Sequence, residues 1–445
     1  MKNHPNQLRR VLGIAFGLAV VTGSTIGSGI LRTPGSIAAL LPNGKLIMLC
    51  WIAIGLYILL AASSYAELTT MMPKAGGAYN YIKRAFGNYA GFIAGWFDFL
   101  CNAIAPAYFC IVLGEYCALI YPQIASHQTI IALAFLTFFM LINIPGVKSG
   151  SFTQKITSAI KILLFIGLIV GCFLHGPGPF AKGAFPIPNG MIQGSIIIAV
   201  FKSLQLILGT YDGWMSVSVF AEEDSNPNRN IPKSYLVGAL TVGILYVLIN
   251  GAILYVMPVF YIAKSPLAAA VAANVAFGQW GGTLMTAVAI FSLVSILNAY
   301  MMIPSRILYG MGRDGFFPKV STVVNKGGTP YYALLICYAF AFILILISSF
   351  EQLFGLATFM MTFVTGFAFA SLIALRKKEP NLPRPYKAWA YPFSTVLALV
   401  VTISLFIGFA ISDTFSLAIV LAIVAVSYIG YKIFVVPNYT PDSHD

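Results

Sequence analysis

The chain of 445 residues is 59% hydrophobic and only 9% charged, with a formal net charge of +13 and a mean hydropathy of +0.87. Soluble proteins carry about 25% charged residues, so this composition excludes an ordinary soluble protein and indicates one that crosses a membrane many times. The positive charge does not indicate a nucleic-acid partner, because the basic residues lie in short loops between apolar runs, as the positive-inside rule predicts.

Apolar runs long enough to cross a bilayer follow one another along the whole chain. We expect an all-α membrane protein, a single transmembrane domain over residues 1–445, since no loop is long enough to fold separately. Its twelve expected spans are 11–41, 46–68, 88–120, 128–146, 156–175, 191–220, 235–258, 282–306, 331–349, 353–375, 390–411 and 414–435.

The distribution of Lys and Arg predicts the orientation of these spans. If the N-terminus is inside, most basic loop residues lie on the inner side, and the outer side receives only Lys45, Lys182 and Lys264. Basic loops face the cytoplasm, so we expect a multi-pass protein of the cytoplasmic (inner) membrane with both termini in the cytoplasm. The first run is too long for a cleavable signal peptide. An amphipathic stretch that begins at Tyr79 is expected to lie at the inner interface.

The first expected span is interrupted by glycine and hydroxyl residues, in the stretch Gly23-Ser24-Thr25-Ile26-Gly27-Ser28-Gly29. Each Gly costs about 1 kcal/mol relative to Ala inside a helix. A broken helix in lipid also leaves backbone polar groups without partners, so a break is tolerated only where it is buried in protein or lines a wet cavity. A small-residue packing face is the alternative interpretation, because Gly23 and Gly27 form a GxxxG pair.

The sixth expected span carries a second interruption, Leu208-Gly209-Thr210-Tyr211-Asp212-Gly213-Trp214. Interrupted helices at matching positions of two five-span halves indicate an inverted-repeat transporter with a site near the membrane midplane. Two unrelated kinks are the alternative. Free N–H groups of a half-helix that begins near Ser28 suit a carboxylate. Carbonyls that end the preceding half-helices, near Thr25 and Gly209, suit an ammonium group, so the expected ligand is a zwitterion.

Several motifs along the chain resemble those of one family. Gly27-Ser28-Gly29-Ile30 resembles the GSGI motif of the amino acid–polyamine–organocation superfamily, and most of all its L-type amino acid transporter branch. Tyr211-Asp212-Gly213-Trp214 and the following segment, Glu222 to Pro232, resemble the span-six signature and cytoplasmic loop of that branch. The resemblance covers nearly the whole chain in order and suggests a bacterial-type, single-chain member.

The resemblance implies a LeuT-type fold of twelve helices with a 5+5 inverted repeat and broken helices 1 and 6. The first repeat would be residues 11–175, the second 191–375, and two accessory helices would occupy 390–435. It also implies alternating access and Na⁺-independent transport of L-amino acids, often by exchange. A polyamine or amine antiporter, or a proton-coupled symporter of the same superfamily, remains open as an alternative.

The same resemblance assigns substrate-binding positions. Ser28 and Gly29 would hold the carboxylate, the carbonyls of Thr25, Gly209 and Asp212 would receive the ammonium, and Gly27 and Gly213 would permit the unwinding. The full predicted set is Thr25, Ile26, Gly27, Ser28, Gly29, Gly209, Thr210, Tyr211, Asp212 and Gly213.

Two residues depart from the pattern of the branch. The branch has an aromatic gate where this chain has Gly209, which implies a roomier site or a gate supplied elsewhere. Arg32 replaces an apolar residue, and either pairs with a carboxylate or extends its side chain outward.

Two ionisable residues lie within expected spans, where such residues are costly and usually functional. Asp212 either attracts a cationic substrate side chain or bonds internally. Lys161 matches the span-five lysine of the branch, whose ammonium occupies the place of a sodium ion, and would connect the broken first helix to span eight; extension toward the cytoplasmic face is the alternative. Ser295 and Asn298 in span eight either line the cavity or form interhelical hydrogen bonds.

The sequence contains no metalloprotease, nucleophile-elbow or phosphate-loop motif, so we expect neither an enzyme nor a cofactor or metal. The six cysteines lie in apolar runs without a CxxC pair and are typical of small core residues. Animal members of the branch pair with a glycoprotein through a cysteine between spans three and four. The corresponding loop, 121–127, has none, so we expect no disulfide-linked heavy chain, and a monomer or homodimer whose partners are the bilayer and an amino acid.

Overall fold

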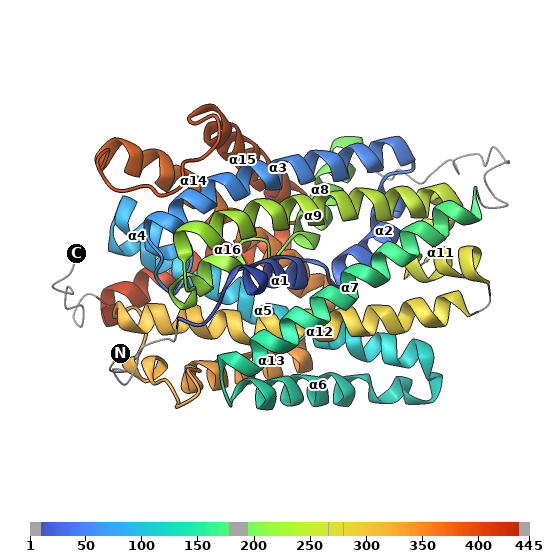
Figure 1. Ribbon diagram of the computed structural model, residues 1–445, viewed down its shortest axis with the longest axis horizontal. Helices are drawn as coiled ribbons and strands as arrows, with labels where there is room; N and C mark the ends of the chain where they lie inside the picture. The colour runs from blue at the N-terminus through green and yellow to red at the C-terminus, as the bar shows by residue number, and fades with distance from the viewer. Residues whose placement is uncertain (1–9, 178–194, 266, 279, 436–445) are drawn as a thin grey trace.

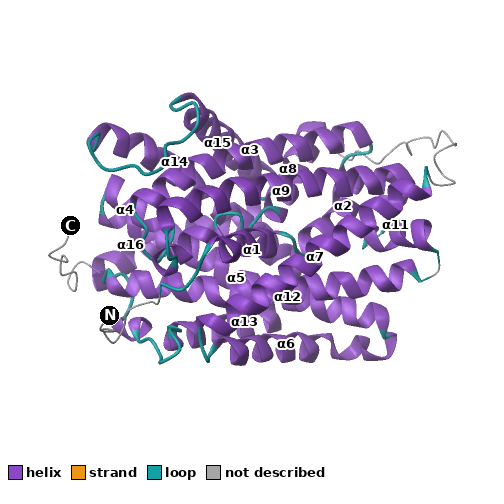
Figure 2. Ribbon diagram, viewed as in Figure 1, coloured by secondary structure: helices purple, strands orange, loops and turns teal. Residues whose placement is uncertain are grey.

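A computed structural model describes residues 10–177, 195–265, 267–278 and 280–435. Within these ranges the chain is built from helices and connecting loops, and two isolated bridges are the only β-type pairing (Figure 2). The longer helices run side by side along the long axis of the molecule (Figure 1). The helices are α1 Ile14–Thr25, α2 Ser28–Leu40, α3 Gly44–Met71, α4 Tyr79–Phe86, α5 Asn88–Ile120, α6 Gln128–Asn143, α7 Val147–His175, α8 Ile196–Thr210, α9 Pro227–Val256, α10 Val259–Ala263, α11 Ala268–Phe277, α12 Gly281–Arg313, α13 Tyr331–Ile347, α14 Phe350–Lys378, α15 Phe393–Ser412 and α16 Thr414–Gly430. The 3₁₀ segments are η1 Pro122–His127, η2 Ser216–Glu223 and η3 Lys319–Thr322, and a π-helical turn covers Tyr431–Val435.

Ten helical segments of the described residues are long and apolar enough to cross a membrane, counting α1 and α2 together. The all-α prediction is therefore confirmed, and each expected span coincides with a helix or a broken pair of helices. Residues 191–194 of the sixth expected span, and the chain ends 1–9 and 436–445 on which the predicted termini lie, are outside the described residues.

Both predicted interruptions are real breaks in the helices. The first helix stops at Thr25, and Ile26 and Gly27 are not helical (ψ 94° and −147°) before α2 begins at Ser28. The second stops at Thr210, and Gly213 has a φ of +100°, a backbone conformation that favours glycine. The helix is therefore interrupted in the first stretch, where Gly27 also packs closely against Ile296 on α12.

Other boundaries differ from the prediction because polar residues can also be helical. The helix α7 begins at Val147, earlier than the expected 156, since its first turns lie outside the apolar run. The short helices α10 and α11 lie in a segment that was expected to be a loop, at the end of the bundle opposite α4 (Figure 1). The expected amphipathic segment after Pro73 is the helix α4, which ends with Lys83 and Arg84 in its last turn.

The helix α1 packs closely against α9. A Cβ atom added at Gly17 would lie 2.2 Å from the Ser234 hydroxyl, and one added at Gly238 would lie 2.5 Å from the Val21 side chain. These contacts require glycine, because any larger residue would separate the two helices. They hold α1, and with it the first break, in the centre of the bundle.

A buried carboxylate fixes the connection between α14 and α15 to α3. Glu67 is fully buried near the end of α3. Its two oxygens accept hydrogen bonds from Arg376 Nε (2.8 Å) and Nη2 (2.6 Å), and the Ala388 backbone N–H donates to it at 2.7 Å. Arg384 adds a second cation at 3.2 Å. Glu67 is thus a structural partner of this connection.

Candidate functional site

The fold brings the two breaks into direct contact. A Cβ atom added at Gly29, in the first turn of α2, would lie 2.9 Å from the Thr210 Cα atom at the end of α8. One added at Gly213 would lie 2.7 Å from the Ser24 carbonyl, and the Ser24 hydroxyl donates to the Gly213 carbonyl at 3.1 Å. Glycine at both positions therefore allows the backbones of the two broken helices to touch.

The N-terminus of α2 lies at this junction without a side-chain cap. The first N–H groups of a helix have no partner within the helix, so they carry partial positive charge and suit an anion. Gly27 precedes this turn, and a Cβ there would lie 2.5 Å from the Ile296 side chain on α12. The Ser28 backbone begins α2, while its side chain lies outside what the structure describes.

The C-terminus of α1 is bound by Lys161 on α7, which is fully buried. Its ammonium donates to the carbonyls of Gly23 at 2.8 Å and Ile26 at 2.5 Å. The Ser292 hydroxyl on α12 also donates to the Ile26 carbonyl, at 3.1 Å. A fixed cation thus lies at the negative end of the α1 dipole. Lys161 contacts the broken first helix, as predicted, and the alternative in which it extends to the cytoplasmic face is wrong.

Tyr246 on α9 connects the two breaks, and the sequence did not reveal it. Its buried hydroxyl lies 2.8 Å from the Thr25 carbonyl and 2.9 Å from the Thr210 carbonyl. These are the last residues of α1 and α8. One hydroxyl hydrogen is shared between two carbonyls, so Tyr246 stabilises the contact between the broken helices.

Replacing Tyr246 by Phe is expected to reduce transport about fivefold to tenfold, because one net hydrogen bond contributes about 1 kcal/mol. Counterflow by the purified protein in liposomes measures the effect. Tyr255→Phe, on the same helix and exposed, is the matched control. Equal rates for the Tyr246 variant and this control would contradict the role.

Asp212 belongs to a polar group beside the second break. Its Oδ1 atom accepts a hydrogen bond from the Gly213 N–H at 2.9 Å, and its side chain interacts electrostatically with Tyr300 and with Asp98. Asn102 donates to Asp98 Oδ1 at 3.0 Å. Among the described residues, no Lys or Arg forms a salt bridge with either aspartate. The group is therefore acidic and has no cation of its own there.

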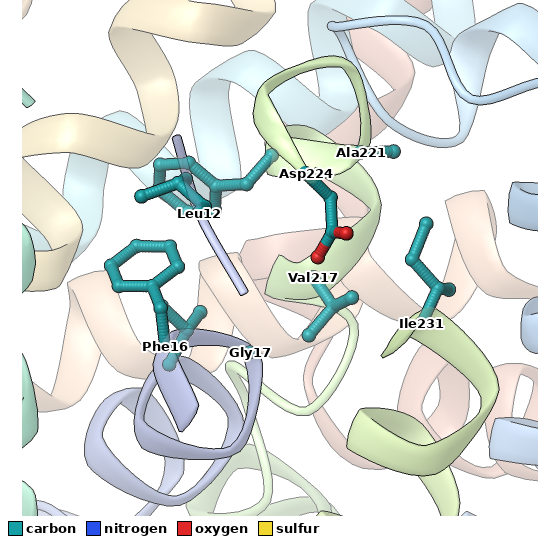
Figure 3. Close-up of a pocket in the computed structure, with 9 residues that line it drawn as sticks. Leu12, Phe16, Gly17, Val217, Ala221, Asp224 and Ile231 are labelled. Carbon is teal, nitrogen blue, oxygen red and sulfur yellow. The ribbon is translucent and has the colours of Figure 1, made fainter. Parts of the chain in front are cut away.

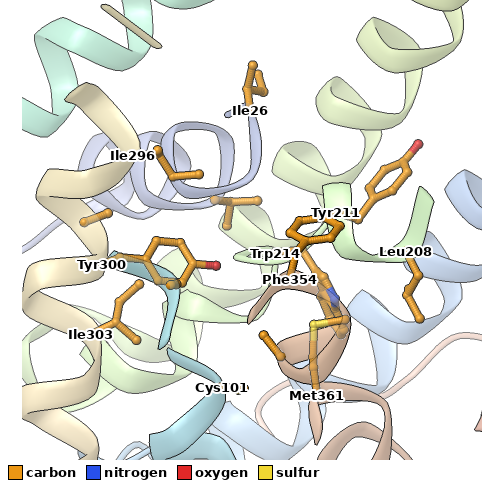
Figure 4. Packing of buried hydrophobic residues seen from close by; sticks show 14 of the residues in the cluster. Ile26, Cys101, Leu208, Tyr211, Trp214, Ile296, Tyr300, Ile303, Phe354 and Met361 are labelled. Atoms are coloured by element: carbon orange, nitrogen blue, oxygen red, sulfur yellow. The ribbon is translucent and has the colours of Figure 1, made fainter. Parts of the chain in front are cut away.

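The remaining predicted residues contribute either their backbone or an aromatic ring. Thr25, Ile26, Gly209 and Thr210 lie at the breaks through their backbones. Tyr211 packs against Trp51 and Tyr246, and its hydroxyl points away from Trp214 and Phe354, whereas the Tyr300 hydroxyl points toward them (Figure 4).

Ser295 and Asn298 on α12 bond between helices. The Ser295 hydroxyl donates to Thr157 on α7 at 2.8 Å, and Asn298 accepts from Asn143 on α6 at 3.1 Å. Both side chains are fully buried. The geometry therefore supports the interhelical alternative for this pair.

The bundle is closed at the end where α1 begins, termed the α1 end. Buried Arg306 and Glu223 form an ion pair there at 3.1 Å. The N–H groups of Val11 and Leu12 donate to the Glu223 carbonyl, and Ser225 N–H donates to the Leu12 carbonyl. Leu12, Phe16, Val217 and Asp224 surround a cavity of about 10 Å³ (Figure 3), which is about the space of one water molecule.

The opposite end, where α2 ends, is termed the α2 end and is hollow. A cavity of about 300 Å³ lies there, called the vestibule and lined by residues of α2, α8, α14 and the C-terminal end of α15. Arg32 lies on its wall and pairs with Glu115 and, at 2.6 Å, with Glu351. Of the two alternatives for Arg32, pairing with a carboxylate is confirmed.

Comparisons with known proteins identify the family of the chain. The amino acid permease family model matches residues 14–428. The serine/threonine exchanger SteT of Bacillus subtilis is 29% identical over 422 residues, which cover 94% of each chain. The mouse b(0,+)-type amino acid transporter 1 is 28% identical over 90% of this chain and 82% of its own length, and the human cystine/glutamate transporter is 25% identical over 98% and 87%.

These matches extend over almost the entire helical bundle, including both breaks. The predicted family and the prediction that the chain is not an enzyme are confirmed, since the matched proteins are permeases and exchangers. With its many apolar helices, the protein is a multi-pass membrane protein. The chain belongs to the amino acid permease family, in the amino acid transporter branch of the amino acid–polyamine–organocation superfamily.

Proposed function

We propose that this protein exchanges L-amino acids across the cytoplasmic membrane by Na⁺-independent alternating access. The observation that supports this most is the contact between two broken helices, with an uncapped helix N-terminus on one side and helix-ending carbonyls on the other. Broken helices in this arrangement form the central sites of transporters. Exchange is also the activity in the name of the serine/threonine exchanger.

The proposed architecture is the LeuT type with twelve spans. The helices α1 and α2 would together form span one, and α8 with η2 would form span six. The two repeats would be residues 11–175 and 191–375, and α15 and α16 would be the accessory helices. The excess of Lys and Arg in loops at the α1 end supports a cytoplasmic location for that end; the α2 end would then face outward.

The amino acid would bind between the two breaks. Its carboxylate would take the N–H groups at Ser28 and Gly29, and its ammonium would take the carbonyls near Thr25, Gly209 and Asp212. The Thr25 carbonyl already accepts from Tyr246, but a carbonyl has two lone pairs and accepts a second donor. Both ligand charges would then be held chiefly by backbone groups, which leaves the side chain of the substrate to be selected by the surrounding walls.

Lys161 would make sodium unnecessary. Its ammonium already supplies a positive charge to the Gly23 and Ile26 carbonyls. A metal ion bound there would leave two cations in one buried place, which is unfavourable.

Asp212 would set the preference for charged substrates if its carboxylate faces the ligand. We expect Asp212→Asn to weaken transport of Arg, Lys or ornithine about tenfold relative to neutral amino acids, because an interaction with a charged group contributes about 1.5–3 kcal/mol. Counterflow rates for matched cationic and neutral substrates measure the ratio. Equal losses for both classes would favour the alternative, in which Asp212 only bonds internally.

The acidic pair of Asp98 and Asp212 favours one second candidate function, an amine or polyamine antiporter. In that case the carboxylates would bind the ammonium of a ligand that has no carboxylate of its own. Competition of amino acid uptake by putrescine or agmatine separates the two functions. Strong competition by these amines, with no amino acid counterflow, would support the second.

The proposed function is tested by counterflow in liposomes over a panel of amino acids, with and without Na⁺ and a pH gradient. We expect exchange without Na⁺; strict Na⁺ dependence would contradict the proposal, and a dependence on the pH gradient would indicate proton symport. The purified single chain, as a monomer or homodimer, should be sufficient, because the segment between α5 and α6 contains no cysteine for a disulfide-linked partner. An obligatory second chain would contradict that part of the proposal.

A further inference from the structure

Phe354 lies between the vestibule at the α2 end and the second break, because it lines the vestibule and its ring contacts Gly209. Phe354 lines the vestibule together with Arg32, Gln205 and Phe350. It is one helical turn, about 6 Å, further into the bundle than Phe350. A Cβ atom added at Gly209 would lie 2.7 Å from two carbons of the Phe354 ring. The ring therefore occupies the space that a side chain at position 209 would need.

Phe354 is the inner member of a stacked column. Its ring lies 5.1 Å from that of Phe350 at an interplanar angle of 20°, and the Arg32 guanidinium lies over Phe350, 4.3 Å from the ring centroid. Tyr108 on α5 meets both rings edge-on, at 5.8 and 5.6 Å. The column connects the ion pairs of Arg32 at the outer end to the backbone of the second break.

The backbone of Gly209, beside this ring, cannot by itself separate the vestibule from the second break. Gly209 has no side chain, and Thr358, one turn beyond Phe354 on α14, is the other close neighbour of its missing Cβ, at 2.5 Å. Phe354 is 5% exposed, so the ring is almost completely buried in this space. Because protein interiors are close-packed, a second aromatic ring and Phe354 cannot both be accommodated there.

We infer that Phe354 is the outer gate of the central site. In its observed position the ring separates the vestibule from the junction of the two breaks. Release of Arg32 from Glu115 and Glu351 would free Phe350, and with it Phe354, to move away from Gly209 and admit an amino acid. Return of the ring would exclude water from the ligand. This inference rests on the proposed function for its ligand, while the position of the ring does not depend on it.

A labelling experiment tests the gate without measuring transport. Cys101 on α5 is buried and lies seven residues, about 10 Å, further from the α2 end than Tyr108. With the other five cysteines replaced by alanine, a membrane-impermeant thiol reagent is added from the α2 side. We expect Phe354→Ala to speed the labelling of Cys101 about tenfold, because the closed gate is the barrier. Phe359→Ala, a buried ring on the same helix that packs on Phe406, is the control.

Swapping the side chains at positions 209 and 354 gives a second test. Gly209→Phe alone is expected to give misfolded or inactive protein, because the new side chain meets Phe354. The double variant Gly209→Phe/Phe354→Ala is expected to restore both slow labelling and counterflow, since one ring again fills the space. Size-exclusion profiles and melting temperatures separate misfolding from an open gate, and Phe354→Leu replaces the alanine variant if that one does not fold.

The possible outcomes distinguish this inference from the proposed function. If wild-type protein exchanges amino acids but Phe354→Ala labels no faster than Phe359→Ala, the gate is wrong and the function stands. If Phe354→Ala labels faster while wild-type protein exchanges no amino acid, the gate stands and the function is wrong. A double variant that folds but labels as fast as Phe354→Ala would also overturn the inference.

Discussion

Lys161→Met is expected to slow amino acid counterflow at least about 100-fold, because it removes two charged hydrogen bonds that are each worth about 1.5–3 kcal/mol. Methionine keeps most of the length and apolar volume of the buried side chain, so the packing of α7 against α1 changes little. What is lost is the positive charge that holds the Gly23 and Ile26 carbonyls at the first break. Without it the broken end of α1 has fewer donors and the central site is less well ordered.

Lys155→Met is the matched control for this result. Lys155 lies on the same helix but is exposed, so its replacement should change counterflow by less than about twofold. Both variants should remain indifferent to Na⁺. A Lys161 variant that works at the wild-type rate, or wild-type protein that requires Na⁺, would contradict the role of this ammonium.

Breaking the ion pair between Glu223 and Arg306 is expected to destabilise the protein by about 3–5 kcal/mol, because removal of one partner leaves an uncompensated buried charge. The side chains are 0% and 1% exposed. Glu223→Gln and Arg306→Met should each lower the melting temperature in detergent strongly. The double variant should be more stable than the sum of the single losses predicts, because neither charge is then left alone.

The neighbouring pair of Glu222 and Arg313 is a control on the same two elements. Its side chains are 18% and 35% exposed, at 2.9 Å, so its loss should cost about 1 kcal/mol or less. If Glu223→Gln and Glu222→Gln shifted the melting temperature equally, the buried pair would not hold the α1 end closed. Strictly additive losses in the double variant would show that the two residues do not act together.

The positions of the long apolar helices and of both breaks could be predicted from the sequence because two strong physical signals coincide there. Long apolar runs are required to cross lipid, and glycines next to polar residues are unfavourable inside them. Gly27 and Gly213 therefore marked the breaks correctly. The same reasoning failed for the start of α7, because its first turns are helical without being apolar.

The contacts made by single side chains could not be predicted, because a span that is apolar all round does not reveal which face meets the site. Tyr246 is one of many aromatic residues in the spans, and only the fold shows that its hydroxyl reaches both breaks. Phe354 is likewise one phenylalanine among 34. Lys161 was different, because a buried cation is rare enough to indicate a specific partner from its position alone.

The backbone hydrogen bonds that join residues 11 and 12 to Glu223 and Ser225 couple the segment before α1 to the end of η2. These main-chain hydrogen bonds connect α1 to η2, so we expect that neither element moves without the other. If the α1 end faces the cytoplasm, as proposed, opening toward that side would accordingly be a single concerted step. A bulky fusion partner attached immediately before Val11 would strain these hydrogen bonds, and a flexible spacer between the partner and Val11 would avoid the strain.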